Sequence, residues 1–265
     1  MIINKETIVA LANQKKRLDN RSLEEYRQPF KIDINISRTA EGSARVQIGN
    51  TVVLAGVKLS IEKPYNDTPD EGGIMVNAEL TPLSNPEYEP GPPSIKAIEL
   101  ARVTDRGIRE AKTIDLKKLC LEPGEKAWFI IIDLITFNDD GNLFDAAGLA
   151  ALAALKSARF PEYDPETGVV DYKKKTDQPL PLLKEPLPVT VYKIGSALLI
   201  DPTLEEEKAY EARLTIASDV NHIISALQKG GAAPLSFEDI SQMIDLAFRK
   251  AKFLREQLDK TFKKK

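Results

Sequence analysis

The stretch KAWFIIIDLITFNDDGNLFDAAGLAALAAL, residues 126–155, joins a long apolar run to a helix of small residues through a tight glycine turn. The first half is long and apolar enough for a strand at the centre of a sheet. The second half, from Leu143 onward, is typical of a helix that packs through Ala and Leu. We therefore expect a central strand that leads directly into a packed helix.

The turn at Gly141 raises the possibility of a phosphate site. The first N–H groups of a helix lack partners, and the helix dipole is positive at this end. With Asn142 as N-cap, however, the first turn holds Leu143, Phe144 and Asp145. We expect the Asp145 carboxylate to face the free donors. A phosphate would then meet a negative charge and two apolar side chains, so the sequence favours an ordinary capped helix.

Alternating apolar and polar residues on either side of this stretch predict further strands. In the first part of the chain these expected strands occupy residues 30–38, 43–49, 51–59 and 74–80, and four in a row suggest an antiparallel layer. A proline-rich loop at 83–93 precedes an expected helix at 94–112. The expected strands of the later part are 187–194, 197–201, 212–218 and 222–230, followed by a helix at 236–262 with Ser236 as N-cap.

Residues 160–188 are rich in Pro, Lys, Asp and Glu and have no periodicity, so we expect an irregular connector there. This composition predicts a boundary between two lobes, residues 1–185 and 186–265. Each lobe has strands first and then a helix. The order indicates an α+β fold with two similarly arranged lobes.

The net charge of the chain does not favour the binding of a polyanion. Lys and Arg number 37 and Asp and Glu number 40, which leaves a net charge of −3. An RNA or anionic lipid would therefore have to bind a local patch. The chain contains no apolar run long enough for a membrane span, and its start, MIINKETIVALANQKK, lacks the features of a signal peptide. We expect a cytoplasmic protein with no membrane partner.

The chain has one cysteine, Cys120, and one histidine, His222. This count excludes an intrachain disulfide and the common zinc spacings. No motif surrounds either residue, so nucleophilic catalysis by a Cys-His or Ser-His pair is a poor hypothesis. We expect Cys120 in the core and His222 at the surface or a strand edge.

The expected helix at 94–112 carries arginines at 102, 106 and 109. At about 100° per residue, Arg106 lies about 40° and Arg109 about 20° from Arg102 around the helix axis, so the three form one stripe. The stripe could be an ordinary solvated face, with Asp105 pairing to Arg109 and Glu99 near Arg102. Arg102 and Arg106 are, however, like charges one turn apart, and a bridging anion would relieve their repulsion. The spacing suits successive phosphates of single-stranded RNA.

Six segments together resemble the RNase PH superfamily, in particular its ring-forming members in the archaeal exosome. They are RLDNRSLEEYR, GSARVQIGNTVVLAGVKL, EYEPGPP, AIELARVTDRGIRE, DDGNLFDAAGLAALAAL and LLIDPTLEEEKAYEARLTIASD, in this order along nearly the whole chain. The resemblance implies the RNase PH-like fold (the ribosomal protein S5 domain 2-like fold) in both lobes. Asn20 stands where the family usually has glycine in its RxDGR motif, and we expect this departure to affect only a turn.

The resemblance also implies a hexameric ring of three heterodimers, each formed with a catalytic subunit of the same superfamily. Single-stranded RNA would thread the ring, with RNA-binding cap proteins on top. At the partner's site, inorganic phosphate would attack the 3′-terminal linkage of the RNA, with Mg²⁺ as a possible second cofactor, and this chain would hold no cofactor of its own. By position, Arg102, Arg106 and Arg109 would contact the RNA.

Two departures from the active members suggest that this chain is not catalytic. Active members carry Gly-Ser/Thr-Arg at the turn into the central helix, where this chain has Gly141, Asn142 and Leu143. Two family aspartates six residues apart fall near Glu207 and Arg213, and a guanidinium can neither coordinate a metal nor accept a proton at neutral pH.

Two alternatives stay open: a phosphorolytic 3′-to-5′ exoribonuclease that uses Glu207 with Asp201 or Asp219, and a purely architectural ring subunit.

Overall fold

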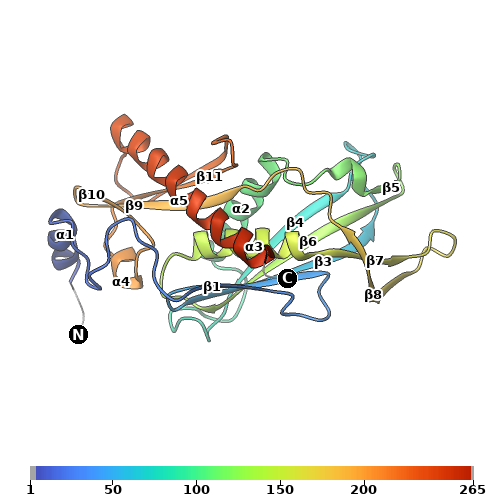
Figure 1. Cartoon of the computed structure of the whole chain (residues 1–265), viewed down its shortest axis with the longest axis horizontal. Helices are drawn as coiled ribbons and strands as arrows, with labels where there is room; N and C mark the ends of the chain where they lie inside the picture. Colours follow the sequence, from blue (N-terminus) through green and yellow to red (C-terminus); the bar gives the residue numbers. More distant parts are fainter. Residues whose placement is uncertain (1–3, 264–265) are drawn as a thin grey trace.

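The computed structural model describes residues 4–263 and contains two main sheets with a helix between them (Figure 1). The helices are α1 (Lys5–Asn13), α2 (Ile95–Glu110), α3 (Leu143–Ser157), α4 (Leu204–Glu207) and α5 (Phe237–Lys263), with a 3-10 turn η1 at Leu116–Leu119. The strands are β1 (Phe30–Ile34), β2 (Gly42–Ile48), β3 (Thr51–Glu62), β4 (Gly73–Leu80), β5 (Cys120–Glu122), β6 (Lys126–Asn138), β7 (Arg159–Tyr163), β8 (Val170–Pro179), β9 (Leu187–Ile194), β10 (Ala197–Ile200), β11 (Ala212–Ser218) and β12 (Ile224–Gly230).

The first sheet has the strand order β1-β2-β3-β6-β4, with the short β5 also paired to β6. The apolar strand β6 is central, as expected, and Ile130, Ile132 and Leu134 are its buried side chains toward the core. The expected antiparallel layer of four consecutive strands is wrong in one respect. The last of the four, β4, does not pair with β3 but lies parallel to β6 on its far side. Strand β6 takes the place beside β3 because it is longer and more apolar, and so buries more surface there.

The second sheet is antiparallel, with the order β10-β9-β11-β12. Helix α5 packs against β9 and β11, and the Asp239 N–H donates to its N-cap Ser236 at 3.0 Å. Helix α1 also packs on this sheet, where Ile8 and Ala12 share an apolar cluster with Tyr192. The N-terminal helix therefore packs on the sheet of the second lobe, although it belongs by sequence to the predicted first lobe, residues 1–185.

Helix α3 is the centre of the molecule. Every residue in it except Lys156 is buried, because it contacts β2 and β3 of the first sheet and β9 of the second. Its small residues let the sheets approach closely: a Cβ on Gly148 would lie 2.1 Å from Cγ of Pro188. The α+β fold with two sheet-and-helix lobes is thus confirmed, while the division at residue 185/186 stays a prediction.

The segment expected as an irregular connector contains a β-hairpin. Strands β7 and β8 pair antiparallel and project from the body at one end of the molecule (Figure 1). Residues 173–175, three lysines, lie in β8. Most of β8 is exposed, so its sequence has no alternation of apolar and polar residues from which a strand could be predicted.

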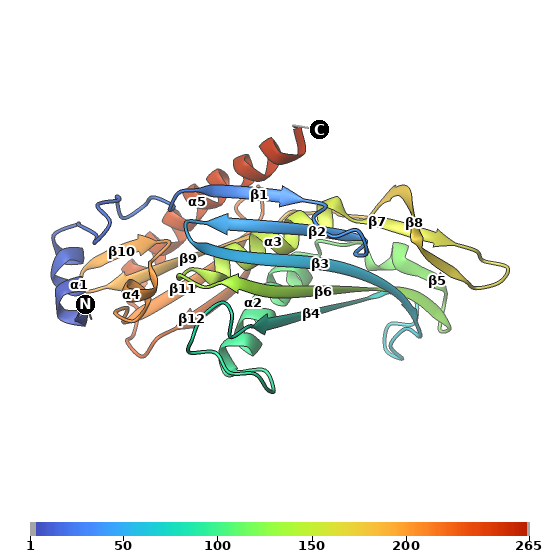
Figure 2. The ribbon, with the colours of Figure 1, turned by 90° about the horizontal axis from the view of Figure 1, so that it is seen from below.

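No helix covers the outer face of the first sheet in the part of the chain that Figure 2 draws in colour. Apolar side chains lie on this face at one end: Leu54 pairs with Ile135, and Phe137 follows two residues later on the same side of β6. Ile135 and Phe137 are exposed, Phe137 at 53%.

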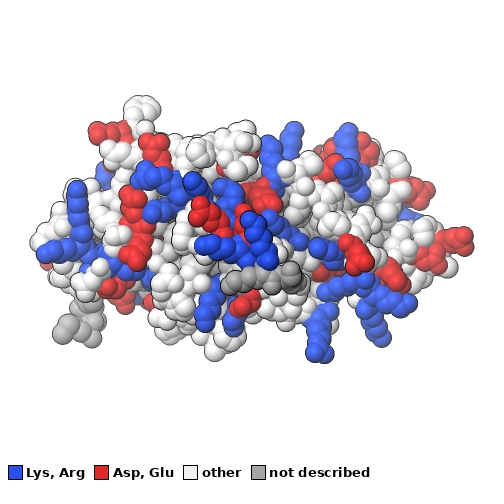
Figure 3. Space-filling model, viewed as in Figure 1, with Lys and Arg blue, Asp and Glu red and all other residues white. Residues whose placement is uncertain are grey.

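The remaining predictions from the sequence concern the net charge, the absence of a membrane span, and the positions of His222 and Cys120. Basic and acidic side chains both occur across the face shown in Figure 3, which agrees with the small net charge. None of the helices within residues 4–263 is both long and apolar enough to cross a membrane. His222 is exposed and stacks on Phe248, as expected for a surface residue. Cys120 is only half-buried in β5, because this edge position leaves one side open.

Candidate RNA interface and degenerate phosphate site

Helix α2 lies between the edge strands of the two sheets, β4 on one side and β12 on the other (Figure 2). Ser94 begins the helix, and its hydroxyl accepts the Ala97 N–H at 3.3 Å. Leu100, Val103 and Ile108 are buried on its inner face. This amphipathic packing leaves the opposite face, with the arginine stripe, turned away from the core.

Arg102 and Arg106 are exposed, and neither has a hydrogen bond or an ion pair with any residue from 4 to 263. The expected proximity of Glu99 to Arg102 does not lead to a pair. Glu99 instead accepts from Arg213 at 2.7 Å and from Gln228 at 3.1 Å, because these side chains reach it from β11 and β12. The two arginines are therefore free to bind an external anion.

Arg109 is held by the protein. Its guanidinium donates to Asp105 at 3.1 and 2.7 Å and to the Ile74 carbonyl at 2.8 Å. These hydrogen bonds to Asp105 raise the pKa of Arg109. Arg109 thus points toward β4, whereas Arg106 lines a shallow groove with Leu227 on the β12 side.

The turn into α3 has the shape of an anion cradle, but the cradle is filled. Gly141 and Asn142 have φ angles of +93° and +62°, and the Asn142 side chain makes no capping hydrogen bond. The Asn142 N–H donates to Oε1 of Glu207 at 2.7 Å, and the Tyr192 hydroxyl donates to the same oxygen at 3.0 Å. Burial raises the pKa of Glu207. A carboxylate from the second lobe thus takes the place of an anion at the turn into the helix.

The expectation that Asp145 faces these donors is wrong. Asp145 is fully buried, and its carboxylate accepts from the Thr190 N–H at 2.7 Å and from the Tyr26 hydroxyl at 2.9 Å. Thr190 lies on β9, so this carboxylate links α3 to the second sheet rather than capping its own helix. Burial raises the pKa of Asp145 to about 7.

Arg213, which the family resemblance predicts to stand at the second degenerate position, is buried. It lies with its guanidinium carbon 4.3 Å from the Phe144 ring centroid and donates to Glu99. Leu143 is 2% exposed and has no cationic group to offer a phosphate. The residues at this position do not fit a magnesium ion, because one carboxylate, Glu207, already accepts two protein hydrogen bonds and the other position is a cation.

A charged cluster beside the cradle was missed from the sequence. Lys96, in the first turn of α2, donates to Asp139 at 3.0 Å, and the Tyr88 hydroxyl donates to the same carboxylate. Partial burial disfavours the Lys96 charge, but Glu207 and Asp139 outweigh this effect and raise the pKa of Lys96. Asp139 is 43 positions from Lys96 and 51 from Tyr88 in the sequence. No sequence motif predicts that they are neighbours.

The segment before β1 fastens the lobes together around Asp201. Arg17 donates to the Asp201 carbonyl at 2.7 Å, and Arg21 and Arg27 donate to its carboxylate at 3.1 and 2.9 Å. Asn20, where the family usually has glycine, has a φ angle of +61°, and asparagine is one of the residues that tolerates this left-handed conformation. The arginine-rich motif was visible in the sequence, but its buried acceptor was not.

The matches to family models cover most of this architecture. Residues 26–161 match domain 1 of the 3′ exoribonuclease family, RNase PH, and residues 184–250 match domain 2. The chain belongs to the RNase PH family. The resemblance drawn from the six sequence segments is thereby confirmed.

Individual members of the RNase PH family match over nearly the full length. The chain is 46% identical to exosome complex component Rrp42 of Thermococcus onnurineus, with 97% of this chain and 94% of that protein covered. It is 44% identical to exosome complex component Rrp42 of Pyrococcus horikoshii, with 99% and 96% covered. Among solved structures, it is similar to the Archaeoglobus fulgidus exosome with RNA bound to the active site, at 40% identity, 96% coverage of both chains and a TM-score of 0.87.

Proposed function

We propose that this protein is a non-catalytic ring subunit of an archaeal exosome that binds single-stranded RNA and positions it for 3′-to-5′ phosphorolysis by a partner. The observation that carries the proposal is the pair Arg102 and Arg106, which is exposed on one face of α2 and has no hydrogen bond or ion pair with any residue from 4 to 263. The family relatives described above are exosome components, and one similar solved structure contains RNA.

The arginine pair favours a phosphate backbone as its ligand. Like charges one turn apart repel by a few tenths of a kcal/mol, and an anion between them removes this cost. The planar guanidinium can donate two hydrogen bonds to one phosphate. Four helical residues span about 6 Å, which allows the two side chains to reach neighbouring phosphates of one strand. Binding of this kind has weak sequence preference and strong salt dependence.

The engaged carboxylates support a subunit without chemistry of its own. Glu207 accepts the Asn142 N–H and the Tyr192 hydroxyl, so it is not free to act as a base. Asp201 accepts from the N-terminal arginines. Asp219 accepts the N–H groups of Asn221 and Ile223, both at 2.9 Å, and so holds the turn before β12.

The proposed partner is a catalytic RNase PH-like subunit, ribosomal-RNA-processing protein 41, in a hexameric ring of three heterodimers in the cytoplasm. Phosphate, and Mg²⁺ where it is needed, would bind at the partner's site, and RNA-binding cap proteins would complete the complex. The uncovered outer face of the first sheet, with Leu54, Ile135 and Phe137, supports a subunit contact, because exposed apolar patches commonly mark interfaces.

The decisive experiment compares mixed rings. Arg102→Ala with Arg106→Ala should weaken the binding of an oligouridylate roughly tenfold or more and slow its phosphorolysis, because two charged contacts are lost. The control, Arg38→Ala with Arg249→Ala, removes two exposed arginines outside α2 and should leave both unchanged. Binding and decay equal to those of the wild-type ring in the first variant would overturn the proposal.

The alternative that the chain is itself a phosphorolytic exoribonuclease has a direct test. The purified chain alone is incubated with single-stranded RNA, phosphate and Mg²⁺, and nucleoside diphosphate release is measured. We expect no release. Release that Glu207→Gln abolishes would show a catalytic subunit, whereas a ring in which RNA never crosslinks to this chain would indicate an architectural one.

A further inference from the structure

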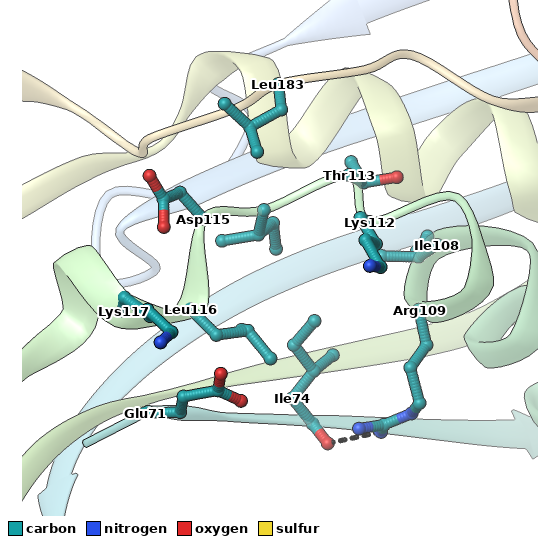
Figure 4. Close-up of a pocket in the computed structure, with 11 residues that line it drawn as sticks. Glu71, Ile74, Ile108, Arg109, Lys112, Thr113, Asp115, Leu116, Lys117 and Leu183 are labelled. Atoms are coloured by element: carbon teal, nitrogen blue, oxygen red, sulfur yellow. Dashed lines mark hydrogen bonds between the residues drawn. The ribbon is translucent and has the colours of Figure 1, made fainter. Parts of the chain in front are cut away.

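A cavity of about 350 Å³ lies at the C-terminal end of the arginine stripe (Figure 4). Its wall includes Arg109 in the last turn of α2, Lys112 just after this helix, Ile74 at the start of β4, Leu116 and Lys117 of η1, and Leu183 before β9. Neither the free pair Arg102 and Arg106 nor the turn into α3 contributes to it, and Arg109 is the stripe residue in its wall.

The cavity is built from segments that hydrogen bonds hold in place. The Leu183 N–H donates to the Thr113 carbonyl at 2.7 Å, the Asp115 N–H to the Pro181 carbonyl at 2.9 Å, and the Gly72 N–H to the Leu116 carbonyl at 2.9 Å. The bond from Arg109 to the Ile74 carbonyl, drawn in Figure 4, closes the side next to α2. The cavity is therefore preformed, as ligand sites usually are.

The cavity combines an apolar floor with a cationic rim. Ile74, Ile108 and Leu116 lie between the charged side chains in Figure 4. Three basic residues, Arg109, Lys112 and Lys117, and two acidic residues, Glu71 and Asp115, line it. Arg109 is paired with Asp105 at 2.7 Å and Lys117 with Asp70 at 3.2 Å, so Lys112 is the rim cation that has no ion pair with any residue from 4 to 263. Asp115 is also paired with Lys118 at 3.6 Å. An apolar recess beside the Lys112 ammonium suits a ligand that has a flat apolar part and an adjoining phosphate.

We propose that this cavity receives a base of the RNA strand whose phosphates lie on Arg102 and Arg106. This inference rests on the proposed function and extends its RNA path by one site. Arg109 lies about 10 Å along the helix from Arg102, so the rim continues the stripe. The base packs on the apolar floor, Lys112 binds an adjoining phosphate, and Arg109, fixed by Asp105 and Ile74, forms the wall between stripe and cavity.

Two variants in the assembled ring test the two halves of the site. Lys112→Ala should lower the slope of log affinity against log salt by about 0.7 for an oligouridylate, because one phosphate contact is lost. Leu183→Trp narrows the cavity at an exposed position, so the fold should tolerate it. It should remove most of the preference for oligouridylate over an abasic strand of equal length. Lys252→Ala, on α5, is the control for charge and should change neither quantity.

The outcomes separate this inference from the proposed function. If the Arg102 and Arg106 variant weakens binding while Lys112→Ala and Leu183→Trp behave like the wild type, only the cavity assignment is overturned, and an apolar side chain of a partner protein becomes its occupant. If none of the variants changes RNA binding, the proposed function itself fails. A reduced salt slope together with a lost base preference establishes the site.

Discussion

At the residue scale, the most informative group is Glu207, whose carboxylate fills the anion cradle at the turn into α3. Glu207→Ala leaves the Asn142 N–H without its acceptor, so we expect the free energy of unfolding to fall by about 1–3 kcal/mol. Millimolar phosphate should restore part of this loss, because an anion can then occupy the cradle. Urea unfolding with and without phosphate measures both effects. Glu205→Ala, an exposed neighbour, is the control. Phosphate that stabilises neither variant would show that the cradle is not an anion site.

At the element scale, the turn between β6 and α3 depends on Gly141. Its φ angle is +93°, and a Cβ there would lie 2.5 Å from the Pro202 carbonyl oxygen. Gly124 also has a positive φ, +77°, but a Cβ on it would meet nothing within 4 Å. Gly124→Ala should therefore cost only the backbone strain, about 1–2 kcal/mol, while Gly141→Ala should cost roughly 1–3 kcal/mol more. Urea unfolding of the two variants checks this difference. Equal losses would mean that the second lobe does not constrain the turn.

At the scale of the whole molecule, Asp145 links α3 to the second sheet through the Thr190 N–H, and burial raises the pKa of this carboxyl to about 7. The folded protein therefore holds a proton that the unfolded chain releases near pH 4, so this group's contribution to stability falls as the pH rises from about 4 to 7. The stability of the wild type relative to Asp145→Asn should decline over this range, by up to about 1.4 kcal/mol per pH unit. Urea unfolding from pH 5 to 8 gives this difference. For the control Asp239→Asn, the ion pair with Lys193 lowers the carboxyl pKa, so the corresponding difference should stay constant above pH 5. A pH-independent difference for Asp145→Asn would contradict the assignment.

The sequence by itself determined the local features of this protein. The apolar run of β6, the small residues of α3, the stripe of arginines on α2 and the absence of a Gly-Ser/Thr-Arg turn at residues 141–143 can all be read from neighbouring positions. The periodicity of apolar residues predicts which side of a helix or strand is buried. The six family segments identified the fold because both their residues and their order along the chain can be read directly from the sequence.

Only the tertiary structure decided which distant groups meet. It made the Glu207 carboxylate, rather than that of Asp145, the acceptor for the Asn142 N–H at the start of α3. It paired Glu99 with Arg213 instead of Arg102, and it placed β6 between β3 and β4. Each of these outcomes depends on the way two sheets close over one helix. Buried carboxylates and N–H groups pair with whichever partners the packing brings within about 3 Å. Residues far apart in the sequence show no local pattern from which such a contact could be predicted.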